Sequence, residues 1–243
     1  MALYSIHPIA LCEGPRDLSS FTYRQNVGTA TKSVCYVWYI EGSQPKILVD
    51  TGVRPSYFTE KGIPETELIS VEDGLARLGL KPEDIQIVIP THLHADHMAL
   101  SYLYKKATFI VQKRELDYAL NPHPIDAFFY DKSFFEDLNM EVIDGPKEII
   151  PGVSVFLSPG HTPGGQSVEV ITAAGKAVIT GFCAMLANFV QNETMKQFGW
   201  EVVPSTIHND DREAYDSMLE IKHRADIILP LHEPSFVGKG TIP

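Results

Sequence analysis

Thr91-His92-Leu93-His94-Ala95-Asp96-His97 brings three histidines and one carboxylate together directly after the apolar run at residues 85–90. Imidazole and carboxylate groups are the side chains that hold a divalent metal ion at neutral pH. In an extended segment, the spacing His-x-His puts two imidazoles on the same side of the chain. His92 and His94 are therefore predicted to bind one ion together.

The second half of this stretch predicts a further pair of ligands. An apolar pattern restarts at Met98, which places Asp96 and His97 in the first turn of a helix, where aspartate is favourable. From that turn both side chains can reach a second ion. A single histidine near a strand end is usually a core or surface residue, but four ligand-type residues at this spacing are typical of a metal site.

Two more histidines follow the same sequence pattern as His92. Ile-Val-Ile-Pro-Thr-His92, Phe-Leu-Ser-Pro-Gly-His161 and Ile-Ile-Leu-Pro-Leu-His232 each consist of an apolar run, a proline, one residue and a histidine. Proline cannot donate to a β-ladder, so it ends the strand and exposes the next side chains. Because ligands bind at the carboxyl ends of strands in α/β sheets, we expect His161 and His232 to complete the metal site. The glycines after His161 allow a close approach of the backbone.

Other polar residues carry less information. Asp50 ends an apolar run, and we interpret it as a turn carboxylate that accepts hydrogen bonds from backbone amides. His208 is kept as a candidate pocket residue because it lies just before the last helical pattern. His7, His123 and His223 are assigned no function.

Length, composition and charge restrict the class of protein. With 243 residues, of which 44% are hydrophobic, the chain is predicted to form one α/β domain over residues 1–243. A net charge of −11 without a Lys/Arg run argues against nucleic acid as a partner. The sequence contains neither a signal-peptide pattern nor an apolar run of membrane-spanning length. We therefore expect a cytoplasmic protein without a membrane partner.

The chain alternates between strand and helix patterns. We expect an edge strand at residues 3–11, an ordered loop beside a site at 12–32, and a hairpin formed by 33–40 and 46–49. Short strands at 140–144, 148–150, 153–157, 167–171 and 177–180 are assigned to a second sheet-forming half. Residues 211–224 have the pattern of an amphipathic helix. The aromatic segment 128–135 is interpreted either as core or as a lid over an apolar pocket.

The motifs together resemble the metallo-β-lactamase superfamily over nearly the whole chain. They are Leu-Val-Asp50-Thr-Gly, Thr-His92-Leu-His94-Ala-Asp96-His97, Pro-Gly-His161-Thr-Pro-Gly and Leu-Pro-Leu-His232. The ending Asp-Ile-Ile-Leu-Pro-Leu-His-Glu-Pro and the preceding Tyr-Asp-Ser-Met-Leu segment are most similar to the N-acyl homoserine lactonase branch. The resemblance implies an αββα sandwich of two mixed sheets flanked by helices. It also implies that His92, His94 and His161 surround one ion, and that Asp96, His97 and His232 surround the other.

The chain departs from that family at one position. The family usually carries a Gly-Asp pair whose aspartate bridges both ions, and this chain has Gly181-Phe182-Cys183 instead. Either Cys183 ligates as a thiolate, which would favour zinc, or the bridge is missing and the second ion is bound more weakly. An inert buried thiol is the alternative for Cys183. Cys12 and Cys35 are expected to be small hydrophobic residues.

The resemblance and the ligand pattern predict a metal-dependent hydrolase that opens a lactone or a related carboxylic ester by attack of a metal-bound hydroxide. Asp96 is expected to bind metal and to orient the attacking water. Two zinc ions are expected, with manganese or iron as alternatives. A thioester hydrolase, a mononuclear-iron enzyme that uses oxygen, and a binding protein with an altered metal site remain open. A homodimer is also open.

Overall fold

Seven strands form the first sheet of the computed structural model, which describes residues 3–243 of the chain. In chain order they are β1 (Ser5–Asp17), β2 (Ala30–Glu41), β3 (Ile47–Val49), β4 (Thr66–Glu67), β5 (Ile87–Ile89), β6 (Thr108–Gln112) and β7 (Met140–Ile143). Their order in the sheet is β4-β1-β2-β3-β5-β6-β7. The sheet is mixed, because β1, β2 and β3 pair antiparallel whereas β3, β5, β6 and β7 run parallel.

Five strands form the second sheet, which packs face to face with the first. They are β8 (Lys147–Ile150), β9 (Val153–Leu157), β10 (Gln166–Thr172), β11 (Gly175–Ile179) and β12 (Ile227–Leu229), in the order β12-β11-β10-β9-β8. The strands from β8 to β11 pair antiparallel, and β12 pairs parallel with β11.

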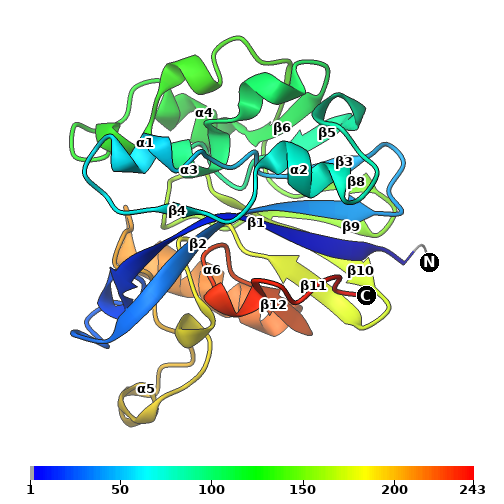
Figure 1. Cartoon of the computed structure of the whole chain (residues 1–243). Helices are drawn as coiled ribbons and strands as arrows, with labels where there is room; N and C mark the ends of the chain where they lie inside the picture. The colour runs from blue at the N-terminus through cyan, green and yellow to red at the C-terminus, as the bar shows by residue number, and fades with distance from the viewer. Residues whose placement is uncertain (1–2) are drawn as a thin grey trace.

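Helices cover the outer faces of both sheets (Figure 1). They are α1 (Ser56–Thr59), α2 (Val71–Ala76), α3 (Ala95–Met98), α4 (Lys113–Ala119), α5 (Glu193–Phe198) and α6 (Asp211–Arg224). The helices α1 to α4 lie outside the first sheet and α6 outside the second, while α5 projects from the sandwich. The layers form the αββα sandwich that the resemblance implied. Within residues 3–243, none of the helices has the length and apolar character needed to span a bilayer.

Strand β2 shows why the first sheet needs a cover on both faces. All its residues from 33 to 40 are buried. Successive side chains of a strand point to opposite faces. Tyr36 and Trp38 therefore enter the core between the sheets, whereas Val37 and Tyr39 enter the core under the helices. Burial on both faces explains why polar and apolar residues do not alternate along this strand.

Several local predictions are confirmed. The hairpin is present, with Trp38 opposite Val49. Apart from these predictions, Ser70 caps α2, because its hydroxyl accepts a hydrogen bond from the Asp73 backbone N–H at 3.1 Å. The last predicted helix coincides with α6.

The loop predicted at residues 12–32 is present but shorter at both ends. β1 continues to Asp17 and β2 begins at Ala30, so that only residues 18–29 connect them. These strand ends pair antiparallel, with Glu13 opposite Val34 and Asp17 opposite Ala30. The ladder satisfies the backbone polar groups of this polar segment, which its own composition does not indicate.

The strand predicted at residues 140–144 is present as β7, but it belongs to the first sheet rather than to the second half. β7 pairs parallel with β6, with Phe109 opposite Met140. A parallel pair needs a long crossover connection, and here α4 and the aromatic segment supply it. The second sheet therefore begins with β8.

Candidate metal centre

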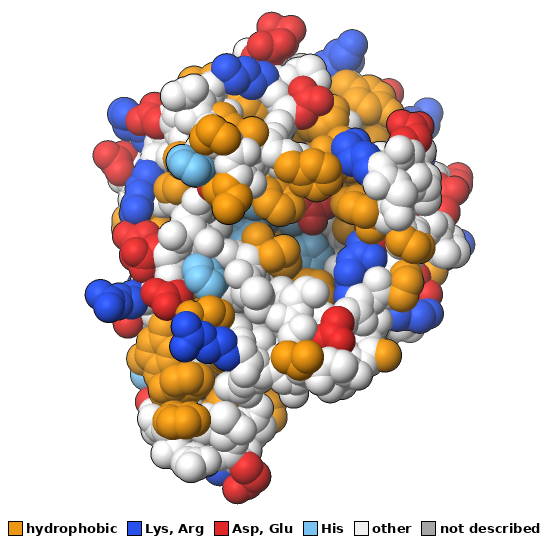
Figure 2. Space-filling view, turned by 90° about the vertical axis from the view of Figure 1, so that its left-hand side faces the viewer, with side chains coloured by type: hydrophobic (Ala, Val, Ile, Leu, Met, Phe, Trp, Pro, Cys, Tyr) orange, Lys and Arg blue, Asp and Glu red, His pale blue; other side chains and the backbone are white. Residues whose placement is uncertain are grey.

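Three loops bring the predicted histidines to one rim of the sandwich. They follow β5, β9 and β12, as the apolar-run and proline pattern indicated. The loops place His92 Nε2 3.2 Å from His161 Nε2, and His232 Nε2 3.8 Å from Asp96 Oδ2. Asp96 and His97 lie in the first turn of α3, as expected. Figure 2 shows a hollow on this side of the molecule, with histidine side chains at its base and hydrophobic side chains around it.

His92, His94 and His161 form one potential ligand group. One ligand atom from each lies within 4.8 Å of the others, and all three residues are buried. The His161 ring is fixed by a contact outside this ligand group, because its Nδ1 donates a hydrogen bond to the Ile207 carbonyl at 2.7 Å. This contact leaves Nε2 with a lone pair directed at the group, which is the arrangement found in metal-binding histidines.

Asp96, His97 and His232 lie next to this group. His97 Nε2 is 3.3 Å from Asp96 Oδ2. His232 Nδ1 donates to the Val34 carbonyl at 3.1 Å, and His97 Nδ1 donates to Asp50 Oδ2 at 2.7 Å, so that both Nε2 atoms are directed inward. His97 Nε2 is buried and has no hydrogen-bond partner among the described residues.

Asp50 holds the loop that carries most of the ligands. It is fully buried and adopts the left-handed conformation with φ of 60°. Its carboxylate accepts hydrogen bonds from the Thr91 backbone N–H at 2.7 Å and from the Thr91 hydroxyl at 3.1 Å, in addition to His97. The predicted turn carboxylate is therefore present. The sequence did not indicate its contact with the His97 ring.

Glu115 on α4 was not predicted from the sequence at all. It is buried and accepts hydrogen bonds from the Leu93 backbone N–H at 2.9 Å and from the Gly164 backbone N–H at 3.1 Å. Tyr130 Oη lies 3.3 Å from the same carboxylate, and its ring lies edge-on to the ring of His94. One carboxylate thus connects the two histidine loops and the aromatic segment.

Burial sets the charge state of four histidines. It lowers the pKa of His161 and of His232 to about 4, and it lowers the pKa values of His92 and His94 well below the usual value. These imidazoles are therefore neutral at pH 7, as metal ligands must be.

The pair formed by Asp96 and His97 is charged. Burial alone would lower the pKa of His97, but the carboxylates of Asp96 and Asp50 raise it to about 10. Burial likewise opposes ionisation of Asp96, and His97 and His232 nevertheless hold its pKa well below the usual range. The second group therefore concentrates charge in a buried place, which is typical of functional sites.

The residues fit a divalent ion. The donors are imidazole nitrogens and a carboxylate, which suit zinc and related ions. Within residues 3–243, the buried Nε2 atom of His97 makes no hydrogen bond and faces the Asp96 carboxylate at 3.3 Å. Outer contacts fix the rings of His97, His161 and His232. Buried polar atoms normally make hydrogen bonds, and an ion between His97 and Asp96 would bind both atoms.

The two candidate thiols lie in different surroundings. Cys35 on β2, expected to be a small hydrophobic residue, has its sulfur within 4.8 Å of ligand atoms of Asp96 and His232. Cys183 belongs to neither ligand group among residues 3–243, and it packs with Phe21 and Met185. Burial raises the pKa of Cys183 to about 12. Ligation by Cys183 stays a prediction.

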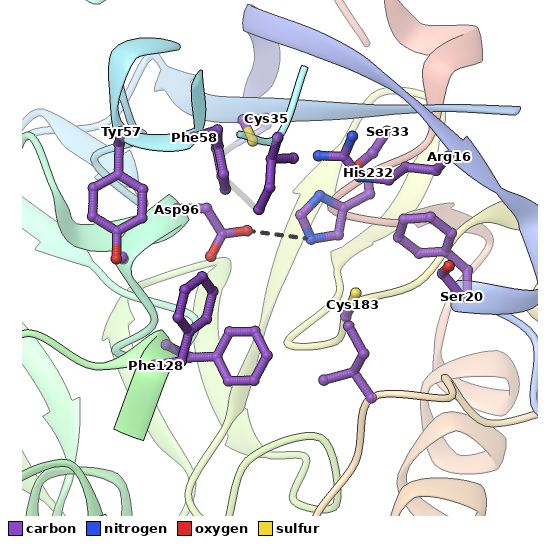
Figure 3. A pocket seen from close by; sticks show the side chains of 15 residues that line it. Arg16, Ser20, Ser33, Cys35, Tyr57, Phe58, Asp96, Phe128, Cys183 and His232 are labelled. Carbon is purple, nitrogen blue, oxygen red and sulfur yellow. Dashed lines mark ion pairs between the residues drawn. The ribbon is translucent and has the colours of Figure 1, made fainter. Parts of the chain in front are cut away.

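A pocket of about 280 Å³ opens onto Asp96 and His232 (Figure 3). Its walls include the aromatic side chains of Phe21, Tyr57, Phe58, Phe128 and Phe129. Within the described lining residues, Arg16 is the only Lys or Arg side chain, and it forms an ion pair with Glu65. His208 is not among the lining residues, although its neighbour Ile207 is.

The two ends of the aromatic segment lie in different surroundings. Phe128 and Phe129 line the pocket. Phe134 and Phe135 instead pack in the core under the helices. The core interpretation is therefore confirmed for the second half of the segment, and a lid formed by the first half stays a prediction.

Comparison with known proteins agrees with this geometry. The family model described as "Metallo-beta-lactamase superfamily" matches residues 30–222. An N-acyl homoserine lactonase from Bacillus sp is 30% identical over 187 residues, which are 71% of this chain and 72% of that protein. N-acyl homoserine lactonase AiiA from Bacillus thuringiensis subsp. kurstaki is 31% identical over 157 residues. That match covers 60% of this chain and 60% of AiiA.

Solved structures of N-acyl homoserine lactone hydrolases have a similar fold. A structure described as N-acyl homoserine lactone hydrolase with the product N-hexanoyl-L-homoserine at its catalytic metal centre has a TM-score of 0.73 and 25% identity, with 98% of this chain and 97% of that chain covered. A quorum-quenching N-acyl homoserine lactone lactonase has a TM-score of 0.74 and 24% identity, with 98% of this chain and 96% of that chain covered.

Proposed function

We propose that this chain, which belongs to the metallo-beta-lactamase superfamily, is a metal-dependent hydrolase that opens a lactone or a related carboxylic ester. One observation carries the proposal: two adjoining groups of buried histidines and Asp96 converge beside a pocket that Asp96 and His232 line. The relatives described as N-acyl homoserine lactonases support a lactone as the first choice of substrate.

The chain supplies positioning and electrostatics to this reaction. A bound divalent ion would polarise the carbonyl and acidify a water molecule. His92, His94 and His161 would hold one ion, and Asp96, His97 and His232 the other. Asp96 lines the pocket as a carboxylate, so it can accept a hydrogen bond from the attacking water and orient it.

The pocket favours an apolar ester over a phosphate substrate. Phosphate diesters carry a negative charge and are usually bound by several Arg or Lys side chains. Arg16 is the one such side chain among the described lining residues, and Glu65 already neutralises it. Phe128 and Phe129 instead offer apolar surface to an acyl chain or a ring.

The test is metal analysis per chain combined with a pH-stat assay against lactones, esters and thioesters. We expect about two zinc or similar ions and release of acid from a lactone. His94→Ala should lose metal and at least about 100-fold in activity, because it removes a buried ligand. His223→Ala, an exposed histidine on α6, serves as the matched control and should retain both.

Four outcomes would contradict the proposal. Full activity of His94→Ala would exclude a metallohydrolase. Faster hydrolysis of thioesters than of lactones would change the substrate class. Oxygen consumption by a protein that holds iron, or tight metal binding without any turnover, would favour the oxygen-using or binding alternatives. A single domain over residues 1–243, a cytoplasmic location and a homodimer remain predictions.

A further inference from the structure

We propose that the Cys35 thiol is a ligand of the second metal ion, together with Asp96 and His232 and next to His97. The proposal rests on the proposed function, because it assigns a residue to the same metal centre. Cys35 lies on β2, far in sequence from the histidine stretch, from His161 and from His232.

The distances between the ligand atoms are compatible with a single zinc ion. Two ligands at about 2.0–2.3 Å from a tetrahedral zinc ion lie about 3.3–3.8 Å apart. Asp96 Oδ2 is 3.3 Å from His97 Nε2 and 3.8 Å from His232 Nε2. The Cys35 sulfur lies within 4.8 Å of ligand atoms of Asp96 and His232, so a small side-chain adjustment brings it to the same ion.

The Nε2 atom of His97 is a second indication of an ion at this place. His97 is 3% exposed, and its Nε2 has no hydrogen-bond partner among residues 3–243. Asp50 fixes the ring through Nδ1, so that Nε2 is aimed at Asp96. His97 Nε2 and Asp96 Oδ2 therefore face each other as a buried ion pair in which Nε2 makes no hydrogen bond, and an ion bound by both atoms would explain this placement.

Strand β2 positions both Cys35 and His232. The Val34 carbonyl accepts a hydrogen bond from His232 Nδ1 at 3.1 Å, and the Val34 N–H donates to the His232 carbonyl at 3.3 Å. The next side chain along the strand is Cys35. It points to the opposite face from Val34, toward the side where α3 carries Asp96.

Charge gives the chemical reason for a thiolate. Two divalent ions bring four positive charges. Apart from Cys35, the two ligand groups consist of imidazoles, which supply no negative charge, and the carboxylate of Asp96. Asp50 and Glu65 are engaged by His97 and Arg16. A ligating Cys35 loses its proton to the ion's field and adds a second negative ligand. Its softness selects zinc or cobalt over manganese.

The competing interpretation is a purely structural thiol. Cys35 packs with Cys12 and Val53, and Cys12 is its direct neighbour across the β1–β2 ladder. Cys183 is the competing ligand, and it lies on the other side of His232 from Cys35 in the view of Figure 3. Variants of the three cysteines separate these possibilities.

The experiment uses the full-length protein loaded with cobalt(II). A thiolate bound to cobalt(II) gives a charge-transfer absorption in the near ultraviolet. We expect this band in the wild type, its loss in Cys35→Ser, and its retention in Cys183→Ser and Cys12→Ser. Cobalt content should fall from about two ions to about one in Cys35→Ser, with at least about a tenfold loss of affinity for the second ion.

Circular dichroism and urea unfolding verify that each variant is folded, and Cys35→Ala replaces Cys35→Ser if the buried hydroxyl prevents folding. Retention of the band in both Cys35 variants, its loss in Cys183→Ser alone, or its absence from wild type would overturn the proposal.

Lactone turnover is measured on the same samples. A wild-type protein that shows the Cys35-dependent band without turnover would contradict the proposed function and support the ligand assignment.

Discussion

Asp50 shows how one residue can stabilise a loop and orient a ligand. Its left-handed backbone conformation is unusual for a residue other than glycine, and two Thr91 donors and the His97 ring hold it there. Strain of this kind persists only where surrounding contacts over-determine it. The carboxylate therefore supports the candidate metal centre although it belongs to neither ligand group.

Asp50→Asn should weaken metal binding by about 10- to 100-fold, the usual cost of losing an outer partner of a metal-binding histidine. The asparagine oxygen can still accept from the Thr91 N–H, but the amide NH₂ cannot accept from His97 Nδ1. Competition with a chromogenic chelator measures the affinity. Asp73→Asn, at an exposed position on α2, is the control. Unchanged affinity in Asp50→Asn would exclude this role.

At the residue scale, the sequence indicated where the histidines converge but not where the thiols lie. Three histidines after apolar runs form a pattern that is visible along the chain. Cys35 lies in β2, where all residues from 33 to 40 are buried. From the sequence alone, it therefore cannot be distinguished from a small hydrophobic core residue. Its nearness to Asp96 depends on how β2 packs against α3, and spacing within the sequence carries no such information.

Helix α4 connects elements that hold the centre. Glu115 joins the loops after β5 and β9, and this requires a close approach at Gly164. A Cβ atom at Gly164 would collide with the backbone nitrogen of Glu115, so only glycine fits. The sequence-based expectation of a close backbone approach after His161 is thereby confirmed. Burial raises the pKa of the Glu115 carboxyl, although the amides of Leu93 and Gly164 oppose that shift.

Glu115→Gln should lower the free energy of unfolding by about 1–3 kcal/mol, because one of the two buried N–H donors loses its acceptor. The loops of His94 and His161 should then be less well held, and kcat should fall with little change in KM. Urea unfolding and lactone kinetics give these quantities. Glu220→Gln on the exposed face of α6 is the matched substitution. Equal stability of both variants would show that the carboxylate does not tie the loops.

The element that the sequence missed most clearly is the extension of β1. Residues 12–17 contain Gly14, Pro15 and Arg16, which usually mark a loop. They nevertheless pair with β2, and this pairing brings Arg16 to the pocket. A strand partner on the far side of the connecting loop supplies the missing hydrogen bonds, so local composition was a poor guide here.

At the scale of the whole molecule, the order of apolar runs predicted the layers, but not which sheet each strand joins. β7 lies next to β6 because a crossover through α4 returns the chain to the first sheet. Convergence of the three histidine loops was predictable, since strand ends in α/β proteins meet at one edge. The contacts that hold the histidine rings from outside, such as that of the Ile207 carbonyl with His161, come from loops distant in sequence. They could be identified only from the structure.

The convergence of buried histidines has a consequence for the stability of the metal-free protein. Burial lowers the pKa of His161 and His232 to about 4, whereas the unfolded chain has values near 6.5. Between these limits the unfolded state binds more protons, so stability falls as the pH is lowered from 6.5 toward 4. His97 acts oppositely, since its contribution is fully present below pH 6.5 and is lost as the pH rises through about 10.

Urea unfolding in the presence of a chelator should therefore show a steady loss of stability between pH 6.5 and pH 4.5. Each histidine that stays neutral in the folded state contributes up to about 1.4 kcal/mol per pH unit in this window. His161→Gln should reduce the slope by about one proton, and His223→Ala, which changes an exposed ring, should not. A metal-free protein whose stability is flat over this range would show that the rings are not buried as neutral ligands.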